Sequence, residues 1–135
     1  MRTIEELCRD GVRGAFYAHE IVQLVPGGAR EFLERVREVG VESYGALGLT
    51  SVGAFRTAMR NDSECVLLWA IPSGTTWADF ERAQDSAPPM LRWRDAIREL
   101  ARDWQRTLLV DAPLAPLRTG RQPQTSDRRP LAEIA

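Results

Sequence analysis

Three residues of this sequence could take part in acid–base or anion-binding chemistry: His19, Glu20 and Arg56. His19 is the single histidine of the chain; a histidine in an apolar cavity could act as a general base toward an acidic carbon or a phenol. Glu20 could act as an acid or a base if burial raised its pKa, and Arg56 could hold a carboxylate or an enolate oxygen. Each also has a structural interpretation: a hydrogen-bonded histidine, a salt bridge between Glu20 and Arg56 across a sheet, and a solvated arginine at a strand edge.

The stretch from Phe16 to Val25 carries both His19 and Glu20. Aromatic and β-branched residues dominate it and Pro26-Gly27-Gly28 follows, which is typical of a β-strand that ends in a turn. Because successive side chains of a strand point to opposite faces, His19 and Glu20 cannot both enter one cavity unless a bulge intervenes. Both faces are mainly apolar, so the pattern leaves open which of the two faces a cavity.

Aromatic side chains are available to line a site for a flat hydrophobic ligand. The aromatic residues available are Tyr17, Phe55, Trp69, Trp77, Trp93 and Trp104, although most aromatic residues of a small domain belong to its core. We take Tyr17, Phe55, Trp69 and Trp77 as the candidates for ligand binding. One histidine without an acidic companion at a ligand spacing gives no metal site. The Pro-Gly-Gly turn lacks the lysine and spacing of a phosphate-binding loop. We therefore expect no metal and no cofactor.

Hydrophobic periodicity predicts the elements that position these residues. They are, in order, a short N-terminal helix with a capping box at Thr3 and Glu6, the strand 16–25, an amphipathic helix 29–47, strands 49–59 and 64–71 joined as a hairpin, a helix capped by Thr75 or Thr76, a helical segment 90–103 after the interrupting Pro88-Pro89, and a β-type run 105–110.

This order is β-α-β-β-α-β with an extra N-terminal helix, which predicts a ferredoxin-like α+β fold: a four-stranded antiparallel sheet with both helices on one face. We expect a helical extension over 1–15, the sheet domain over 16–111 and an extended, Pro-rich tail over 112–135. Strands 16–25 and 64–71 are apolar on both faces, so the uncovered face would be a large apolar patch. A homodimer that closes two sheets face to face would bury it and enclose a ligand cavity.

The bulk composition limits the classes of function. The 135 residues correspond to one domain. A net charge of −1 gives no field that would attract nucleic acid, and no apolar run approaches the ~20 residues of a membrane span. The N-terminus does not resemble a signal peptide, and two distant cysteines are typical of free thiols in a reducing compartment. We expect a cytoplasmic protein without nucleic-acid or membrane partners.

The stretch from Phe16 to about Val110 resembles the NIPSNAP family of the dimeric α+β barrel superfamily. The resemblance rests on the first strand ending in Pro26-Gly27, the helix directly after it, the segment Val52-Gly53-Ala54-Phe55-Arg56-Thr57, and Leu68-Trp69 followed by the Trp77 helix. It implies a dimer of ferredoxin-like units with a pocket between sheet and helices. It does not imply one chemistry, because the superfamily includes cofactor-free monooxygenases, haem-degrading enzymes, isomerases and ligand-binding proteins. Many NIPSNAP members carry Arg-x-Tyr before the Pro-Gly, where this sequence has Glu20 and Val22.

These interpretations predict a small cofactor-independent enzyme of oxygenase, cyclase or isomerase type, acting on a hydrophobic aromatic or polyketide-like molecule. His19 or Glu20 would be the base, Arg56 would hold the oxyanion, and the four aromatic candidates would bind the ligand. One alternative is a non-catalytic dimer whose barrel only binds a hydrophobic molecule. Another is a structural dimer that contacts a partner protein through its Pro-rich tail. Light scattering at micromolar concentration tests the dimer. A ligand screen that compares the wild type with His19→Ala and Glu20→Ala tests the proposed site.

Overall fold

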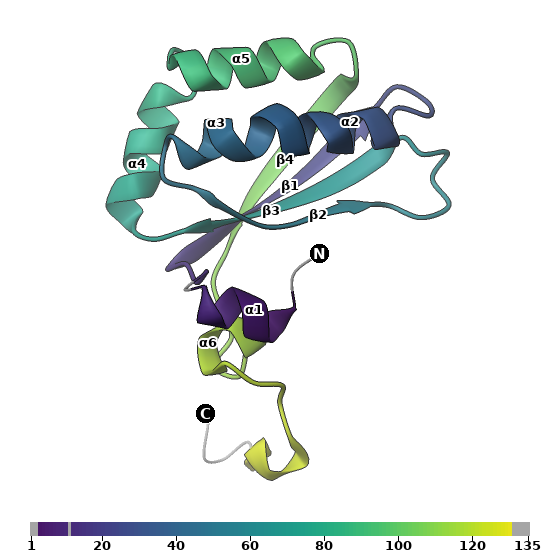
Figure 1. Ribbon diagram of the computed structural model, residues 1–135. Coiled ribbons are helices and arrows are strands. Elements are labelled where there is room, and N and C mark those ends of the chain that lie inside the picture. The colour runs from purple at the N-terminus through teal and green to yellow at the C-terminus, as the bar shows by residue number, and fades with distance from the viewer. Residues whose placement is uncertain (1–2, 11, 131–135) are drawn as a thin grey trace.

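A four-stranded antiparallel sheet forms the centre of the protein in the computed structural model, which describes residues 3–10 and 12–130. Its strands are β1 (Phe16–Leu24), β2 (Thr50–Arg56), β3 (Glu64–Ile71) and β4 (Ala101–Leu109), in the order β2-β3-β1-β4. The helices α2 (Ala29–Arg35), α3 (Val41–Gly45), α4 (Gly74–Ala83) and α5 (Pro88–Ile97) lie on one face of the sheet (Figure 1). This is the ferredoxin-like α+β fold, and that prediction is confirmed.

The predicted bounds of two helices and one strand were wrong. Ser73 caps α4, since its hydroxyl accepts a hydrogen bond from the Thr76 N–H at 3.1 Å; Thr75 and Thr76 lie inside the helix. Pro88 and Pro89 start α5, because proline fits the first helical turn, where its missing N–H has no partner to lose. Helix α5 ends at Ile97, and β4 begins four residues earlier than the apolar pattern indicated.

The predicted helix over 29–47 is one helical rod with a π-helical turn, Val36–Gly40, between α2 and α3. A π turn holds one more residue than an α turn and therefore changes which residues face the sheet after it. Gly40 ends this turn against Trp93 of α5: a Cβ at position 40 would lie 3.0 Å from the indole ring. Tyr44, one turn later, is fully buried.

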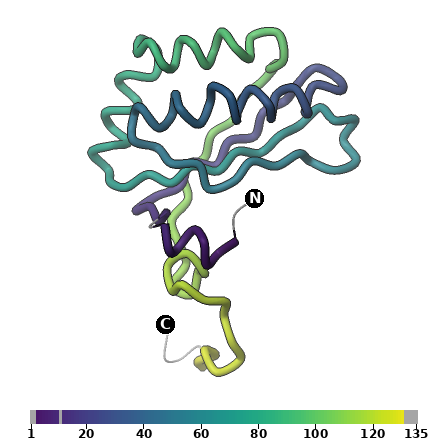
Figure 2. Tube along the Cα trace, viewed as in Figure 1, coloured from purple at the N-terminus to yellow at the C-terminus, as the bar shows by residue number. Residues whose placement is uncertain are grey.

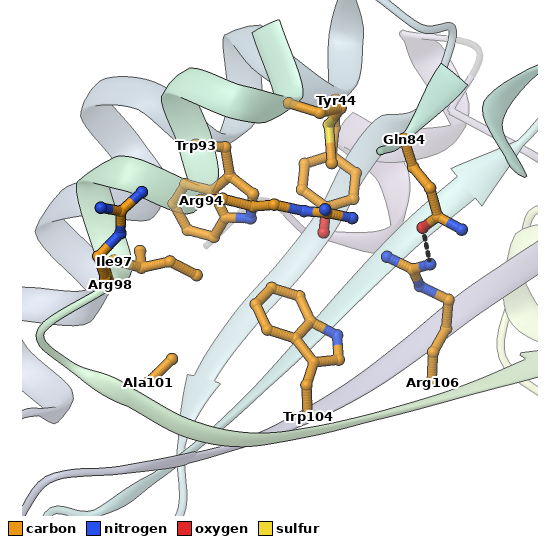
Figure 3. Close-up of a pocket in the computed structure, with 10 residues that line it drawn as sticks. Tyr44, Gln84, Trp93, Arg94, Ile97, Arg98, Ala101, Trp104 and Arg106 are labelled. Carbon is orange, nitrogen blue, oxygen red and sulfur yellow. Dashed lines mark hydrogen bonds between the residues drawn. The ribbon is translucent and has the colours of Figure 1, made fainter. Parts of the chain in front are cut away.

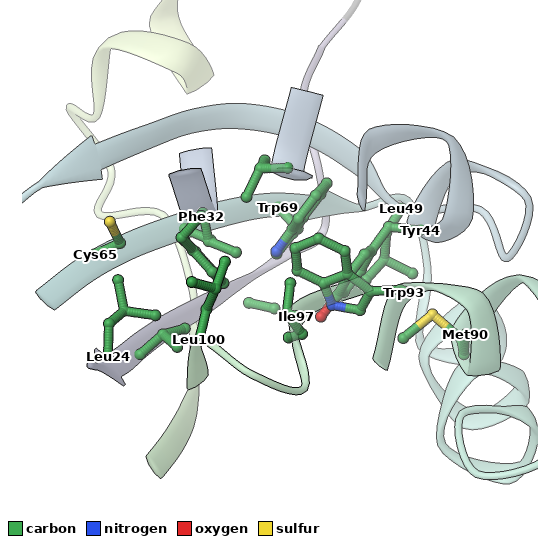
Figure 4. Close-up of a cluster of buried hydrophobic side chains, with 14 of the residues drawn as sticks. Leu24, Phe32, Tyr44, Leu49, Cys65, Trp69, Met90, Trp93, Ile97 and Leu100 are labelled. Atoms are coloured by element: carbon green, nitrogen blue, oxygen red, sulfur yellow. The ribbon is translucent and has the colours of Figure 1, made fainter. Parts of the chain in front are cut away.

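The main core fills the space between the sheet and α2–α5 (Figure 4). Its largest side chains are aromatic: the Tyr44 ring stacks on Trp69 with 4.0 Å between centroids, and Phe80 and Trp93 complete the group around Tyr44. Cys65 lies in this core as a free thiol whose pKa is raised by burial to about 11, so it is not a nucleophile at neutral pH.

Among the residues that the structure describes, α1 (Ile4–Arg9) and α6 (Pro116–Thr119) cover the opposite face of the sheet at one end. Helix α1 begins with the predicted Thr3–Glu6 capping box and lies beside α6 below the sheet (Figures 1 and 2). A second apolar cluster joins these segments to the sheet through Leu7, Tyr17 and Leu117. The tail is thus not wholly extended, since it contains α6 and a 3₁₀ turn at Thr125–Asp127; its last predicted residues, 131–135, lie outside the described part.

Within the described ranges, no helix combines the length and apolar character that crossing a bilayer requires.

Candidate active site

A cavity of about 380 Å³ opens between the sheet and the helices α3, α4 and α5 (Figure 3). Such a volume is within the ~300–1,000 Å³ typical of small-molecule sites. Its walls are formed by Tyr44, Gln84, Met90, Trp93, Arg94, Ile97, Arg98, Ala101, Trp104 and Arg106. The cavity therefore combines aromatic walls with several cationic groups.

Glu20 lies directly behind this wall. Strand alternation places it on the helix-covered face of β1, where it has no exposed surface and where Arg106 is its cross-strand neighbour on β4. The Tyr44 hydroxyl donates a hydrogen bond to Glu20 Oε2 over 3.1 Å, and Arg106 Nη2 lies 3.6 Å from the same oxygen. Tyr44 and Arg106 both line the cavity, so they connect the buried carboxyl to its interior.

Burial controls the protonation of this group of residues. The loss of hydration raises the pKa of Glu20 above its ordinary value of 4.5, and this effect exceeds the opposing influence of the Arg106 charge and the Tyr44 hydrogen bond. Burial, followed by the nearby Glu20 charge, raises the pKa of Tyr44 well above 10.0, so the phenol keeps its proton. Within the described structure, Glu20 Oε1 has no hydrogen-bond partner. The indole N–H groups of Trp104 and Trp69, which also lack a hydrogen-bond partner of good geometry, lie close enough to the carboxyl to lower its pKa, by less than burial raises it. A buried carboxyl with a raised pKa is typical of a general base.

Arg106 is held in place by contacts on three sides. Its Nη1 donates to Gln84 Oε1 over 2.8 Å, a bond that Figure 3 shows at the end of the cavity. Its guanidinium lies 5.7 Å from the centre of the Trp77 ring and 5.1 Å from that of Phe80. Such cation–π contacts fix the plane of the guanidinium beside the carboxyl.

His19 and Glu20 lie on opposite faces of β1, as strand alternation predicted. His19 is half-buried on the outer face of the sheet, which is the face opposite helices α2–α5. It lies between Leu68 of β3 and Thr107 of β4. Of the two residues, Glu20 is thus the one beside the cavity.

Arg56 does not form the salt bridge with Glu20 that the sequence left open. It lies at the end of the edge strand β2, is 54% exposed, and pairs with Asp62 at 3.4 Å. The cation beside Glu20 is Arg106 instead, because β4, and not β2, is the hydrogen-bonded neighbour of β1.

The four aromatic candidates are divided between the two faces. Trp69 is buried beneath the cavity wall, stacked on Tyr44, and Trp77 lies on α4 under Arg106. The Tyr17 hydroxyl donates to Asp111 on the outer face, and Phe55 is 40% exposed there. The structure therefore does not bring these four side chains into one pocket.

The sequence did not indicate Tyr44, Arg94, Arg98 or Arg106 as site residues, whereas Trp93 and Trp104 were among the aromatic residues available for a site. Tyr44 follows Phe32, Val36 and Gly40 at steps of four and so extends the apolar face of the helix, which is a usable sign of a buried phenol. Trp104 and Arg106 are two residues apart in β4 and so share the helix-covered face of the sheet. This pattern was missed because the strand was predicted to begin at residue 105.

In the part of the chain that the structure describes, no three His, Cys, Asp or Glu side chains lie close enough together to hold a metal ion.

The strand order and the cavity between sheet and helices define a ferredoxin-like α+β protein. Comparison with solved structures finds this fold in NIPSNAP proteins. One of unknown function from Agrobacterium tumefaciens is 25% identical, with the match covering 78% of this chain and 95% of that chain and a TM-score of 0.65. An uncharacterised NIPSNAP-like domain protein from Burkholderia xenovorans is 22% identical over 83% of this chain and 97% of that chain, with a TM-score of 0.64.

A second group of similar structures has a different description. A candidate antibiotic biosynthesis monooxygenase from Nitrosomonas europaea is 16% identical over 75% of this chain and 94% of that chain, with a TM-score of 0.55, which shows a shared fold. No protein-family model and no curated protein sequence matches the chain. The resemblance to NIPSNAP proteins expected from the sequence is thus confirmed at the level of structure.

Proposed function

We propose that the chain is a small cofactor-independent enzyme that removes and returns a proton on a flat aromatic or polyketide-like molecule. One observation carries this proposal: a fully buried carboxyl, Glu20, is joined to the interior of a ligand-sized cavity by the hydroxyl of Tyr44. A structural core residue at this position would not need a carboxyl, since the burial of an ionisable group costs stability.

The geometry supports a two-step proton relay. A C–H or O–H proton of the substrate passes to the Tyr44 oxygen while the Tyr44 proton passes to Glu20 Oε2, which lies 3.1 Å away. The base is thus the Glu20 carboxylate, and the total charge of substrate and site is unchanged. The substrate is left as an enolate or a phenolate, whose negative oxygen the Arg106 guanidinium can stabilise. Return of the proton to a different carbon gives an isomerase, and attack of the enolate on a second carbonyl gives a cyclase.

The raised pKa of Glu20 favours this role, because a general base works best when its pKa is near the working pH. The cavity walls supply Trp104, supported by Trp93, for a flat ring. The likeness to a candidate antibiotic biosynthesis monooxygenase supports a site in the same kind of fold without fixing the reaction.

The proposed enzyme acts as a cytoplasmic homodimer whose partner is a hydrophobic small molecule, with no nucleic-acid or membrane partner. The apolar outer face of the sheet, where Phe55 and Leu109 are exposed, supports the dimer. The free thiols of Cys8 and Cys65 are compatible with a reducing compartment.

Hydrogen exchange of a carbon acid tests the relay. The probe is 2-tetralone, a bicyclic aromatic ketone, in D₂O, with loss of its α-proton signals followed by NMR. We expect the protein to accelerate exchange, Glu20→Gln to abolish the acceleration, and Tyr44→Phe to lower it by about 100-fold. His19→Gln is the matched control, because His19 lies on the other face of the same strand; it should retain full activity.

Exchange that survives Glu20→Gln, or that the protein does not accelerate, would overturn the relay. If 2-tetralone then still binds with Tyr44 and Trp104 in contact with it, the cavity is a binding site without catalysis.

A further inference from the structure

The cavity is cationic as well as aromatic. Three of its ten lining residues are arginines, Arg94, Arg98 and Arg106, and that set contains no aspartate or glutamate. A neutral hydrophobic ligand would leave these charges unused. The positions of these arginines therefore indicate the charge of the ligand.

Arg106 is already engaged inside the protein by Glu20 and Gln84. Arg94 and Arg98 differ from it, because they are 46% and 76% exposed. Arg94 lies in the last turn of α5, and Arg98 is the residue that follows its end.

The partners of Arg94 and Arg98 hold them weakly. Arg94 pairs with Asp85 at 2.7 Å and Arg98 with Asp95 at 3.3 Å, and both aspartates are more than 70% exposed. Exposed ion pairs of this kind contribute little, so either guanidinium can exchange its aspartate for a ligand anion at small cost.

The walls next to these arginines favour a flat ring. Trp93 and Trp104 meet edge to face, with 6.4 Å between ring centres and 84° between planes, and both line the cavity. Trp93 is 1% exposed and supports Trp104 from behind, whereas Trp104 is partly exposed and can contact the ring of a ligand.

We infer that the cavity accepts a flat aromatic carboxylate, with its ring against Trp104 and its carboxylate on one of the two exposed guanidinium groups at the mouth, Arg94 or Arg98. Arg106 is then left for a second oxygen deeper in the cavity, beside Tyr44. This inference rests on the proposed function for the choice of cavity and names the substrate class that the cavity takes.

Titration calorimetry with 1-naphthoate and its neutral analogue 1-naphthamide tests the inference. We expect 1-naphthoate to bind at least about tenfold more tightly, since charge-assisted hydrogen bonds to arginine are the stronger kind. Added salt should weaken 1-naphthoate and leave 1-naphthamide unchanged. The double variant Arg94→Gln/Arg98→Gln should raise the Kd of 1-naphthoate about tenfold without a change for 1-naphthamide.

Arg92→Gln is the matched control, because Arg92 is exposed on the same helix but does not line the cavity; it should change neither Kd. All three arginines of the two variants are exposed, so the fold is retained, which circular dichroism verifies. Equal binding of acid and amide, no measurable binding of 1-naphthoate, or an unchanged Kd in the double variant would overturn the inference.

The two proposals fail in different ways. If 1-naphthoate binds through Arg94 or Arg98 but 2-tetralone exchange is not accelerated, the carboxylate site stands and the proton relay is wrong. If exchange depends on Glu20 while the amide binds as well as the acid, the relay stands and the carboxylate site is wrong.

Discussion

Glu20 is an acid that the fold keeps away from water, and this couples the stability of the protein to pH. The folded state binds the Glu20 proton more tightly than the unfolded chain does, because burial raises the pKa in the folded state alone. A carboxyl whose pKa is higher in the folded protein than in the unfolded chain lowers the free energy of unfolding as the pH rises between these two pKa values. Glu20 therefore destabilises the protein at higher pH.

Glu20→Gln is predicted to remove this pH dependence. The free energy of unfolding of the wild type minus that of the variant should fall as pH rises above the ordinary value of 4.5, by up to about 1.4 kcal/mol per pH unit within the window. Urea denaturation at a series of pH values from 4 upward measures the difference. Glu34→Gln is the control, since Glu34 is exposed on α2 and its pKa is shifted down by Arg37. A pH-independent difference for Glu20→Gln would contradict the prediction.

The sequence predicted part of this site at the level of single residues. Strand alternation correctly separated His19 from Glu20, because the period of two is a property of the backbone. It did not decide which of them faces the cavity, since both faces of β1 carry apolar residues. The partner of Glu20 could not be predicted from the sequence either. Arg106 becomes its neighbour only through the pairing of β1 with β4, a contact between residues 86 positions apart.

At the scale of elements, the helix from Ala29 to Gly45 matters most, because its π turn sets the position of Tyr44. The turn ends at Gly40, whose missing side chain allows Trp93 to approach. Trp93 has almost no freedom to move, since it is 1% exposed and touches Phe32, Tyr44 and Trp104. Glycine at position 40 therefore allows the π turn to pack closely against α5.

The Gly40→Ala variant is predicted to have a lower free energy of unfolding than the Gly45→Ala variant. Both changes gain helix propensity, worth about 0.5–1 kcal/mol. The new Cβ at position 45 meets nothing within 4 Å, whereas the one at position 40 lies 3.0 Å from Trp93. Gly45→Ala should thus be more stable than the wild type, and Gly40→Ala should be at least about 1 kcal/mol less stable than Gly45→Ala, as typical overpacking costs. Chemical denaturation monitored by tryptophan fluorescence measures both.

Equal stability of the two variants would mean that the Trp93 ring can shift freely. In that case the cavity wall would be adaptable, and the ligand affinity of Gly40→Ala would match that of the wild type.

The elements themselves were largely predictable, and the errors have local causes. The bounds of β3 were correct because a continuous apolar run is bounded by polar turns on both sides. The start of β4 was missed because its first residues have weak β-propensity: Ala101 and Asp103 are held in the sheet by pairing with β1, and Arg102 lies between them where the register shifts. The π turn has no composition signal apart from the glycine that ends it.

At the scale of the whole molecule, the described residues 3–10 and 12–130 leave one face of the sheet without a cover over most of its area. Helices α2–α5 cover one face, whereas α1 and α6 reach only the end of the other, near Tyr17 and Ala70. Beyond that end, one row of the sheet crosses all four strands as Phe55, Val66, Ile21 and Gln105. The next row contains Leu68 and His19. A mainly apolar surface of this kind favours contact with a second copy.

The wild type is therefore predicted to be a homodimer, and Val66→Glu to be a monomer. Val66 lies at the centre of the row, with Ile21 and Phe55 as its cross-strand neighbours, so a charge there would be buried without a partner when two sheets meet, at a cost of several kcal/mol. Light scattering at micromolar concentration measures the mass, and circular dichroism verifies that the variant is folded. Leu91→Glu is the matched control, because Leu91 is exposed on the helix side of the molecule; it should leave the dimer intact. A monomeric wild type would contradict the prediction, and it would leave His19 on an open surface instead of at an interface between two sheets.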